Sequence, residues 1–229
     1  GIAGTNFINW QADVPEDVAA AVAQRIDDFA AHCSFPTCLT GLQVCKLAQL
    51  AAEVGGIAAD RRVMPLGSYI AYKLSGRFVT DNNLAAMSGL YSRRDRLWNA
   101  QALSAAVITE AMLPEVLDVG SVAATTDKRA TLWAGPAGVP IVLAGNDQTA
   151  AAFGADLNTA HPLLVVLGTA QVLYGRFADE TNLPSTAVKG PYPFGGTYGM
   201  AVGRFGGNAV HFAAGVLCGG DVEAFFDRA

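Results

Sequence analysis

Apolar residues recur at three- and four-residue steps in the first half of the chain and fall into short runs in the second half. The first pattern predicts amphipathic helices over residues 15–32, 39–54, 64–74 and 98–112. Asp81 or Asn82 is expected to cap a further short helix, Leu84 to Met87. Residues 115–137 show neither pattern and are expected to form loops with short extended pieces. The first part of the chain is therefore expected to be mostly helical.

From Val139 onward, apolar runs separated by glycine predict strands. These runs cover residues 139–144, 163–167, 170–176 and 198–202. Helical pieces are expected over residues 149–154, 209–217 and 222–226. The alternation predicts an α/β fold, with a joint between Leu157 and Pro162. The segment after this joint is too short to close a sheet, so the chain is expected to be part of a longer protein.

The pattern is clearest where the expected strand 139–144 meets Gly145 and Asn146, followed by Asp147 in the first turn of a helix. Open α/β folds place ligands at the carboxyl ends of such strands. The run 163–167 then meets Gly168 and Thr169, a hairpin turn whose backbone N–H groups are free to face an anion. An acid and an anion-accepting turn on neighbouring elements indicate phosphoryl transfer.

Composition narrows the class of protein. The net charge is −5 and no basic patch stands out, which makes nucleic acid an unexpected partner. No apolar run approaches the ~18 residues of a membrane helix. The four cysteines lack zinc spacing. Three of them fall in or beside a helical region, where buried free thiols are expected, and this usage favours a cytoplasmic location. The charged cluster over residues 93–96 is typical of a solvated surface.

Residues 145–154 and 167–170 resemble the central signature of the FGGY carbohydrate kinases, which belong to the actin/hexokinase/Hsp70 superfamily. Residues 72–91, 97–99 and 113–116 are similar, in order, to further passages of the same family. The similarity is closest to xylulokinase-like and sedoheptulokinase-like members. The family's Asp-x-Gly-Thr phosphate loop and its glycine-rich adenosine motif do not occur in this sequence.

The resemblance implies an actin-like ATPase (ribonuclease H-like) two-domain α/β fold, present here as a partial chain. Residues 1–157 would be the later part of the N-terminal FGGY domain, on the substrate side, ending in the catalytic strand-turn-helix. Residues 158–229 would begin the C-terminal domain, on the nucleotide side.

The resemblance also implies roles for individual residues. Asp147 would be the general base that takes the proton of the attacking sugar hydroxyl, with ATP as the phosphoryl donor and Mg²⁺ bridging its phosphates. Gly168 and Thr169 would contact nucleotide phosphate. The substrate contacts would be Asn146, Gln148, Trp10, Gln11 and Asp13, the last three in a segment similar to the family's Trp-x-Asp-x-Arg but without its arginine.

Two functions remain open from the sequence. The first is ATP-dependent phosphorylation of a ketose such as xylulose, or of a related sugar or polyol, with the sugar and ATP as small-molecule partners. The alternative is a catalytically inactive sugar-binding or regulatory relative, favoured by the missing phosphate loop and opposed by Asp147 and by Gly168 and Thr169. On residue chemistry alone, Asp147 could simply favour the helix dipole and Gln148 could face solvent. The oligomeric state is left open, with a homodimer among the alternatives.

Overall fold

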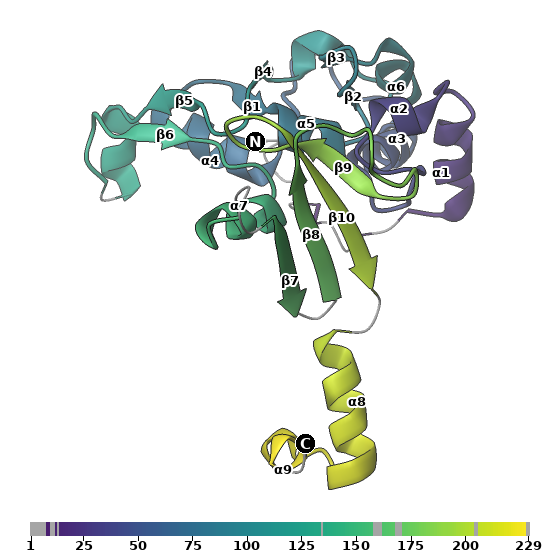
Figure 1. The fold of residues 1–229 in the computed structure, drawn as a ribbon. Coiled ribbons are helices and arrows are strands. Elements are labelled where there is room, and N and C mark those ends of the chain that lie inside the picture. Colours follow the sequence, from purple (N-terminus) through teal and green to yellow (C-terminus); the bar gives the residue numbers. More distant parts are fainter. Residues whose placement is uncertain are drawn as a thin grey trace.

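A helical part and a four-stranded antiparallel sheet lie side by side in the computed structural model, and two C-terminal helices extend away from the sheet (Figure 1). The structure describes residues 8–9, 12, 14–133, 135–157, 162–167, 171–203 and 206–227. Tertiary packing in the helical part is centred on buried residues that include Val44, Cys45, Leu90, Ala102 and Met112. The sheet has a second core of its own.

The helical part is built from six α-helices and one 3₁₀ turn. They are α1 Glu16–Ala23, α2 Phe29–His32, α3 Gln43–Val54, α4 Leu66–Ser75, α5 Asn82–Met87, α6 Ala100–Ala105 and η1 Glu110–Met112. The predicted cap of α5 is confirmed at Asp81, whose carboxylate accepts the Leu84 N–H at 2.9 Å. Helix α3 ends at Gly55 in the left-handed conformation that glycine adopts without strain.

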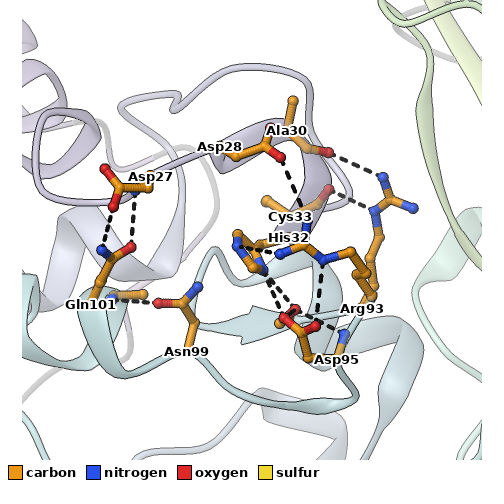
Figure 2. A network of polar contacts seen from close by, with 12 residues as sticks. Asp27, Asp28, Ala30, His32, Cys33, Arg93, Asp95, Asn99 and Gln101 are labelled. Carbon is orange, nitrogen blue, oxygen red and sulfur yellow. Dashed lines mark hydrogen bonds and ion pairs between the residues drawn. The ribbon is translucent and has the colours of Figure 1, made fainter.

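The prediction of one continuous helix over residues 15–32 is wrong. Helix α1 ends at Ala23, and Asp28 has a left-handed backbone with φ 48°. The side chain of Gln101 replaces the missing helical hydrogen bond at Asp27. Its Oε1 accepts the Asp27 N–H at 2.9 Å, and its Nε2 donates to the Asp27 carboxylate at 2.8 Å (Figure 2). A contact from 74 residues away thus satisfies backbone that a continuous helix would have bonded internally.

The predicted helix over residues 98–112 is also interrupted. Asn99 caps α6 through the Ala102 N–H at 3.0 Å, but the helix ends after Ala105. Val107 is left-handed with φ 55°, and the next N–H, from Ile108, returns to the Leu103 carbonyl at 3.1 Å. This turn brings Ile108 into the core and leaves Val107 exposed.

Short strand pairs flank the helices. Strand β1 Val79–Asp81 pairs in parallel with β4 Glu115–Leu117, β2 Tyr91–Ser92 pairs antiparallel with β3 Leu97–Trp98, and β5 Val122–Thr125 pairs antiparallel with β6 Pro140–Val142. Residues 115–137 thus hold the expected extended pieces, together with the 3₁₀ segment η2 Lys128–Trp133. The strand expected over residues 139–144 is shorter, because only Pro140–Val142 pairs with β5.

The four-stranded sheet has the order β7-β8-β10-β9 and is antiparallel throughout. Its strands are β7 Leu163–Leu167, β8 Gln171–Phe177, β9 Val188–Pro191 and β10 Thr197–Gly203. The predicted hairpin is confirmed by the register, which pairs Leu163 with Gly175 and Leu167 with Gln171. Helix α7 Asp147–Gly154 lies beside β7 (Figure 1) and contributes Ala152 to the core of the sheet.

Arg93 corrects the expectation of a solvated charge cluster. Its side chain is only 8% exposed; it forms an ion pair with Glu180 and donates to the carbonyls of Cys33 at 2.9 Å and Ala30 at 3.1 Å (Figure 2). The guanidinium carries five donors in a planar fork, so it can satisfy several acceptors while buried. Arg94 and Arg96 are exposed, as expected.

Helices α8 Gly207–Cys218 and α9 Val222–Phe226 pack on each other beyond the sheet (Figure 1). Their exposed side chains include Phe212, Val216, Leu217 and Phe226. Within the described part of the chain, no helix has the length and apolar character needed to cross a bilayer.

Candidate active site

The turn between β6 and α7 has a conformation that glycine alone accommodates. Gly145 has φ +77°, and a Cβ added to it would lie 2.9 Å from the side-chain amide of Asn83. Asn146 follows as the helix cap, and its Oδ1 accepts the Thr149 N–H at 3.0 Å. Asp147 is therefore the first residue of α7, within the first turn where the sequence places it.

Asn83 fixes this turn by hydrogen bonds. This wholly buried residue of α5 accepts, on Oδ1, the backbone N–H of Asn146 at 3.1 Å and its side-chain Nδ2 at 2.9 Å. Its own Nδ2 donates to Thr149 Oγ1 at 3.1 Å and to the carbonyl of Pro191 at 2.8 Å. A primary amide has two lone pairs and two N–H groups, so all four hydrogen-bonding positions of Asn83 are used.

Thr149 extends the contacts into the sheet. Its hydroxyl lies 2.8 Å from the hydroxyl of Tyr174 on β8. Tyr174 stacks on Tyr198 of β10, with ring centroids 5.2 Å apart, and burial raises the pKa of the Tyr174 phenol above its ordinary value. Because Asn83, Thr149 and Tyr174 are buried and hydrogen-bonded to one another in series, the turn is fixed to both the helical part and the sheet.

A small pocket lies next to the turn. It has a volume of about 230 Å³ and is lined by Asp81, Gly145 and mainly apolar side chains such as Ile70. Asp81 is fully buried at the end of β1, and burial raises its pKa, although the nearby N–H groups of Leu84 and Gly145 act in the opposite direction. An acid whose pKa is raised by burial thus lies next to the turn that carries Asp147.

The two residues after the cap have different environments. Asp147 is exposed, and its Oδ1 accepts the N–H of Gln148 at 2.9 Å. Gln148 is half-buried, and its Oε1 is a buried acceptor with no hydrogen-bond partner among the residues that the structure describes. Native proteins rarely leave a buried acceptor unpaired. The first turn of α7 thus offers an accessible carboxylate beside an acceptor able to take a donor.

The structure brings together three of the residues predicted from the sequence: Asn146, Asp147 and Gln148. The others lie outside the described residues: Trp10, Gln11, Asp13, Gly168 and Thr169. Their place relative to Asp147 stays a prediction, as does the domain division at residue 157. Asn83 and Thr149 were not predicted as site residues, because in the sequence they are only polar residues inside passages that resemble the FGGY family.

A match to known proteins covers the turn and the helices before it. Residues 6–154 match the FGGY family of carbohydrate kinases, N-terminal domain. The chain belongs to this family. The family assignment made from the sequence is thereby confirmed.

Two curated FGGY relatives show how far the sequence similarity extends. The chain is 32% identical over 122 residues to the L-fuculokinase of Escherichia coli strain K12, which is 52% of this chain and 26% of that protein. It is 40% identical over 89 residues to the glycerol kinase of Agrobacterium fabrum, which is 38% of this chain and 17% of that one. The match thus spans about a quarter or less of each relative.

Solved structures of FGGY kinases show the fold. The xylulose kinase of Rhodospirillum rubrum matches with a TM-score of 0.80 at 21% identity, over 93% of this chain and 44% of that one. A ligand-bound xylulose kinase of Lactobacillus acidophilus matches with a TM-score of 0.79 at 17% identity, over 98% of this chain and 47% of that one. The predicted fold class, part of the actin-like ATPase fold, is confirmed.

The residues of the turn between β6 and α7 can be compared with the ligands that a Mg²⁺ ion bound to a nucleotide requires. Within the described ranges, no group of three or more His, Cys, Asp or Glu is arranged to hold a metal ion. Mg²⁺ in phosphoryl-transfer enzymes keeps several waters and takes one or two carboxylates beside the substrate phosphates. The turn presents only the exposed carboxylate of Asp147 among its described residues, so a Mg²⁺ ion there would be held mainly by the nucleotide and water, whereas a transition-metal cage would need more ligands.

Proposed function

We propose that the protein phosphorylates a sugar hydroxyl with ATP and that Asp147 is its general base. The observation that supports this most directly is the position of Asp147. It is an accessible carboxylate in the first turn of α7, on a turn that Asn83 holds with two hydrogen bonds, within a segment that matches a carbohydrate kinase family.

Each residue would have a distinct task. Asp147 would accept the proton of the attacking hydroxyl, and the Oε1 of Gln148 would accept a hydrogen bond from a second hydroxyl of the sugar. Asn146 would contribute to the same surface, while Gly168 and Thr169 would contact nucleotide phosphate. A Mg²⁺ ion bound with the nucleotide would neutralise charge on the phosphates, so the protein mainly has to position the reactants.

A ketose is the substrate class we favour. The curated relatives are named for L-fuculose and glycerol, and the solved structures include xylulose kinases. Xylulose and L-fuculose are both ketoses, and glycerol has only the polyol part that such sugars share. A panel of xylulose, L-fuculose and glycerol in a coupled ADP-release assay on the full-length protein would rank these classes.

The base assignment is tested by Asp147→Asn. We expect the turnover number to fall by roughly 10²–10⁴-fold, because general-base catalysis typically contributes that much. Sugar affinity, measured by calorimetry, should change little, since asparagine keeps the shape of the side chain. Asp156→Asn is the matched control: it removes an acid at the opposite end of α7, and asparagine tolerates its left-handed backbone.

The outcomes separate the alternatives. Wild-type turnover in Asp147→Asn would show that another group takes the proton. Sugar binding by the wild-type protein without any ADP release across the panel would instead favour a sugar-binding or regulatory relative without catalytic activity.

A further inference from the structure

Two of the four cysteines form a close pair outside the candidate active site. Cys38 lies in the irregular segment between α2 and α3, and Cys45 lies in the first turn of α3. Their sulfur atoms are 3.4 Å apart and share a hydrogen bond. A disulfide has an S–S distance of ~2.05 Å, so bond formation requires the two atoms to approach by only about 1.4 Å.

The two thiols differ in accessibility. Cys45 is fully buried in the helical core, and its N–H is bonded to the Leu42 carbonyl at 3.1 Å. Cys38 is partly exposed and lies outside any helix or strand. An oxidant in solution can therefore reach Cys38 first, and the irregular segment gives Cys38 freedom to move toward a fixed Cys45.

The hydrogen bond also makes the two thiols chemically unequal. The bond from Cys45 lowers the pKa of Cys38 below its ordinary value, while the same contact and burial raise the pKa of Cys45. A thiolate is the nucleophile in cysteine oxidation, so Cys38 is the more reactive of the pair. The third cysteine of this region, Cys33, is buried, and its pKa is raised to about 12 by burial.

We propose that Cys38 and Cys45 are a peroxide-sensitive dithiol, in which Cys38 is oxidised first and Cys45 then converts it to a disulfide. In the first step the Cys38 sulfur attacks one oxygen of hydrogen peroxide, the O–O bond breaks, and hydroxide leaves to become water, giving a sulfenic acid. In the second step the Cys45 sulfur attacks the Cys38 sulfur, the S–O bond breaks, and hydroxide leaves with the Cys45 proton as a second water. The two sulfurs together lose two electrons to the peroxide.

The surroundings of the pair give the modification a structural consequence. In the same segment, the Ser34 N–H donates to the Ala86 carbonyl of α5 at 2.9 Å, and the Ser34 carbonyl accepts the Lys189 N–H of β9 at 3.0 Å. These two elements also carry Asn83 and its partner Pro191. A disulfide would thus restrict the segment that contains Ser34 and joins the helical part to the sheet. This segment contacts the two elements that fix the turn between β6 and α7.

The test is a peptide map of the full chain after mild treatment with hydrogen peroxide and alkylation of the remaining thiols. Trypsin releases residues 26–46 as one peptide with Cys33, Cys38 and Cys45, and it leaves Cys218 on another. We expect the first peptide to lose ~2 Da and two alkylation sites, and Cys218 to stay alkylated. Additional cleavage after Leu39 and Leu42 should give two fragments joined by the bond between Cys38 and Cys45.

Three variants make the assignment specific. Cys33→Ser should form the bond as the wild type does, whereas Cys38→Ser and Cys45→Ala should not form it. Alkylation of Cys38 by iodoacetamide at neutral pH should also slow several-fold in Cys45→Ala, because the hydrogen bond that favours the thiolate is lost. This second measurement needs only Cys38 to remain accessible.

The proposal is overturned if the bond forms through Cys33, if Cys38 is oxidised to sulfinic acid without pairing, or if all thiols remain alkylatable after peroxide. Unchanged alkylation of Cys38 in Cys45→Ala would equally contradict the coupling between the two thiols.

Discussion

Asn83 and Asn146 lie 63 residues apart in sequence and are joined by two hydrogen bonds to a single oxygen, Oδ1 of Asn83. One bond comes from the backbone N–H of Asn146 and one from its side chain, so both the path of the turn and the rotamer of the cap depend on Asn83. The neighbouring residue, Asp147, is the proposed base. Its position therefore depends on an amide that belongs to α5.

Replacing Asn83 should affect both the stability of the protein and the position of Asp147, and the two effects can be measured separately. We expect Asn83→Ala to lower the free energy of unfolding by about 2–4 kcal/mol, because buried partners lose their bonds. Turnover should also fall, since Asp147 loses the support that fixes its position. Urea unfolding and steady-state kinetics measure the two effects.

Asn82→Ala is the matched control for Asn83. Asn82 is also a buried amide of α5, but it bonds to Asp118 at 2.8 Å and to the Val119 N–H at 3.0 Å, away from the turn. It should cost stability without changing the turnover of the folded enzyme. Equal kinetic losses in both variants would indicate general damage to α5 and contradict a specific role for Asn83.

Gly145→Ala tests the shape of the turn. Alanine at φ +77° is strained, and its Cβ would press on the Asn83 amide, so we expect a loss of about 2–4 kcal/mol in unfolding free energy. Gly55→Ala has a similar φ of +71° with no atom within 4 Å, and should lose only about 1–2 kcal/mol. Thermal or urea unfolding compares them, and equal losses would show that the close approach of Asn83 carries no cost.

Gln148→Ala tests the unpaired acceptor of the site. If Gln148 Oε1 bonds a sugar hydroxyl, the KM for the sugar should rise ~3–10-fold, the equivalent of one neutral hydrogen bond, while the KM for ATP stays the same. Stability should hardly change, because the group has no partner among the described residues. An unchanged KM for every sugar of the panel would remove Gln148 from the substrate site.

Asp81 predicts a pH dependence of stability. Burial raises its pKa above the ordinary 3.8, so the folded protein binds the proton more tightly than the unfolded chain does. The resulting penalty is absent below about pH 3.8, grows as the pH rises, and becomes constant above the raised pKa. Asp81→Asn keeps a capping oxygen and should therefore be at least as stable as the wild type at pH 7, with the difference closing toward pH 4.

Urea unfolding of Asp81→Asn and wild type at several pH values between 4 and 7 measures that difference. Asp221→Asn controls for replacing a capping carboxylate, because Asp221 caps α9 in the same way from an exposed position. A gap that favours the wild type and widens with pH would show that the Asp81 carboxylate is stabilised by its surroundings.

Local sequence patterns were enough to predict the elements whose hydrogen bonds join residues that are close in sequence. The β7–β8 hairpin, a cap at Asp81 or Asn82 and the place of Asp147 in the first turn of α7 were predicted. Pairing across a short turn, or three residues along a helix, is visible in the order of residues. The helix interruptions at Asp28 and Val107 were not predicted, since apolar spacing continues through both positions. Gln101 decides the first of them from 74 residues away.

The sequence by itself determined the family, the α/β class and the acid at the start of α7. Tertiary structure decided that Asn83 holds the turn, that Arg93 is buried and that Cys38 meets Cys45. The physical reason is the range of the interactions. An amide, a guanidinium or a thiol has no periodic pattern that reveals its partner, and its environment exists only once distant segments are packed together.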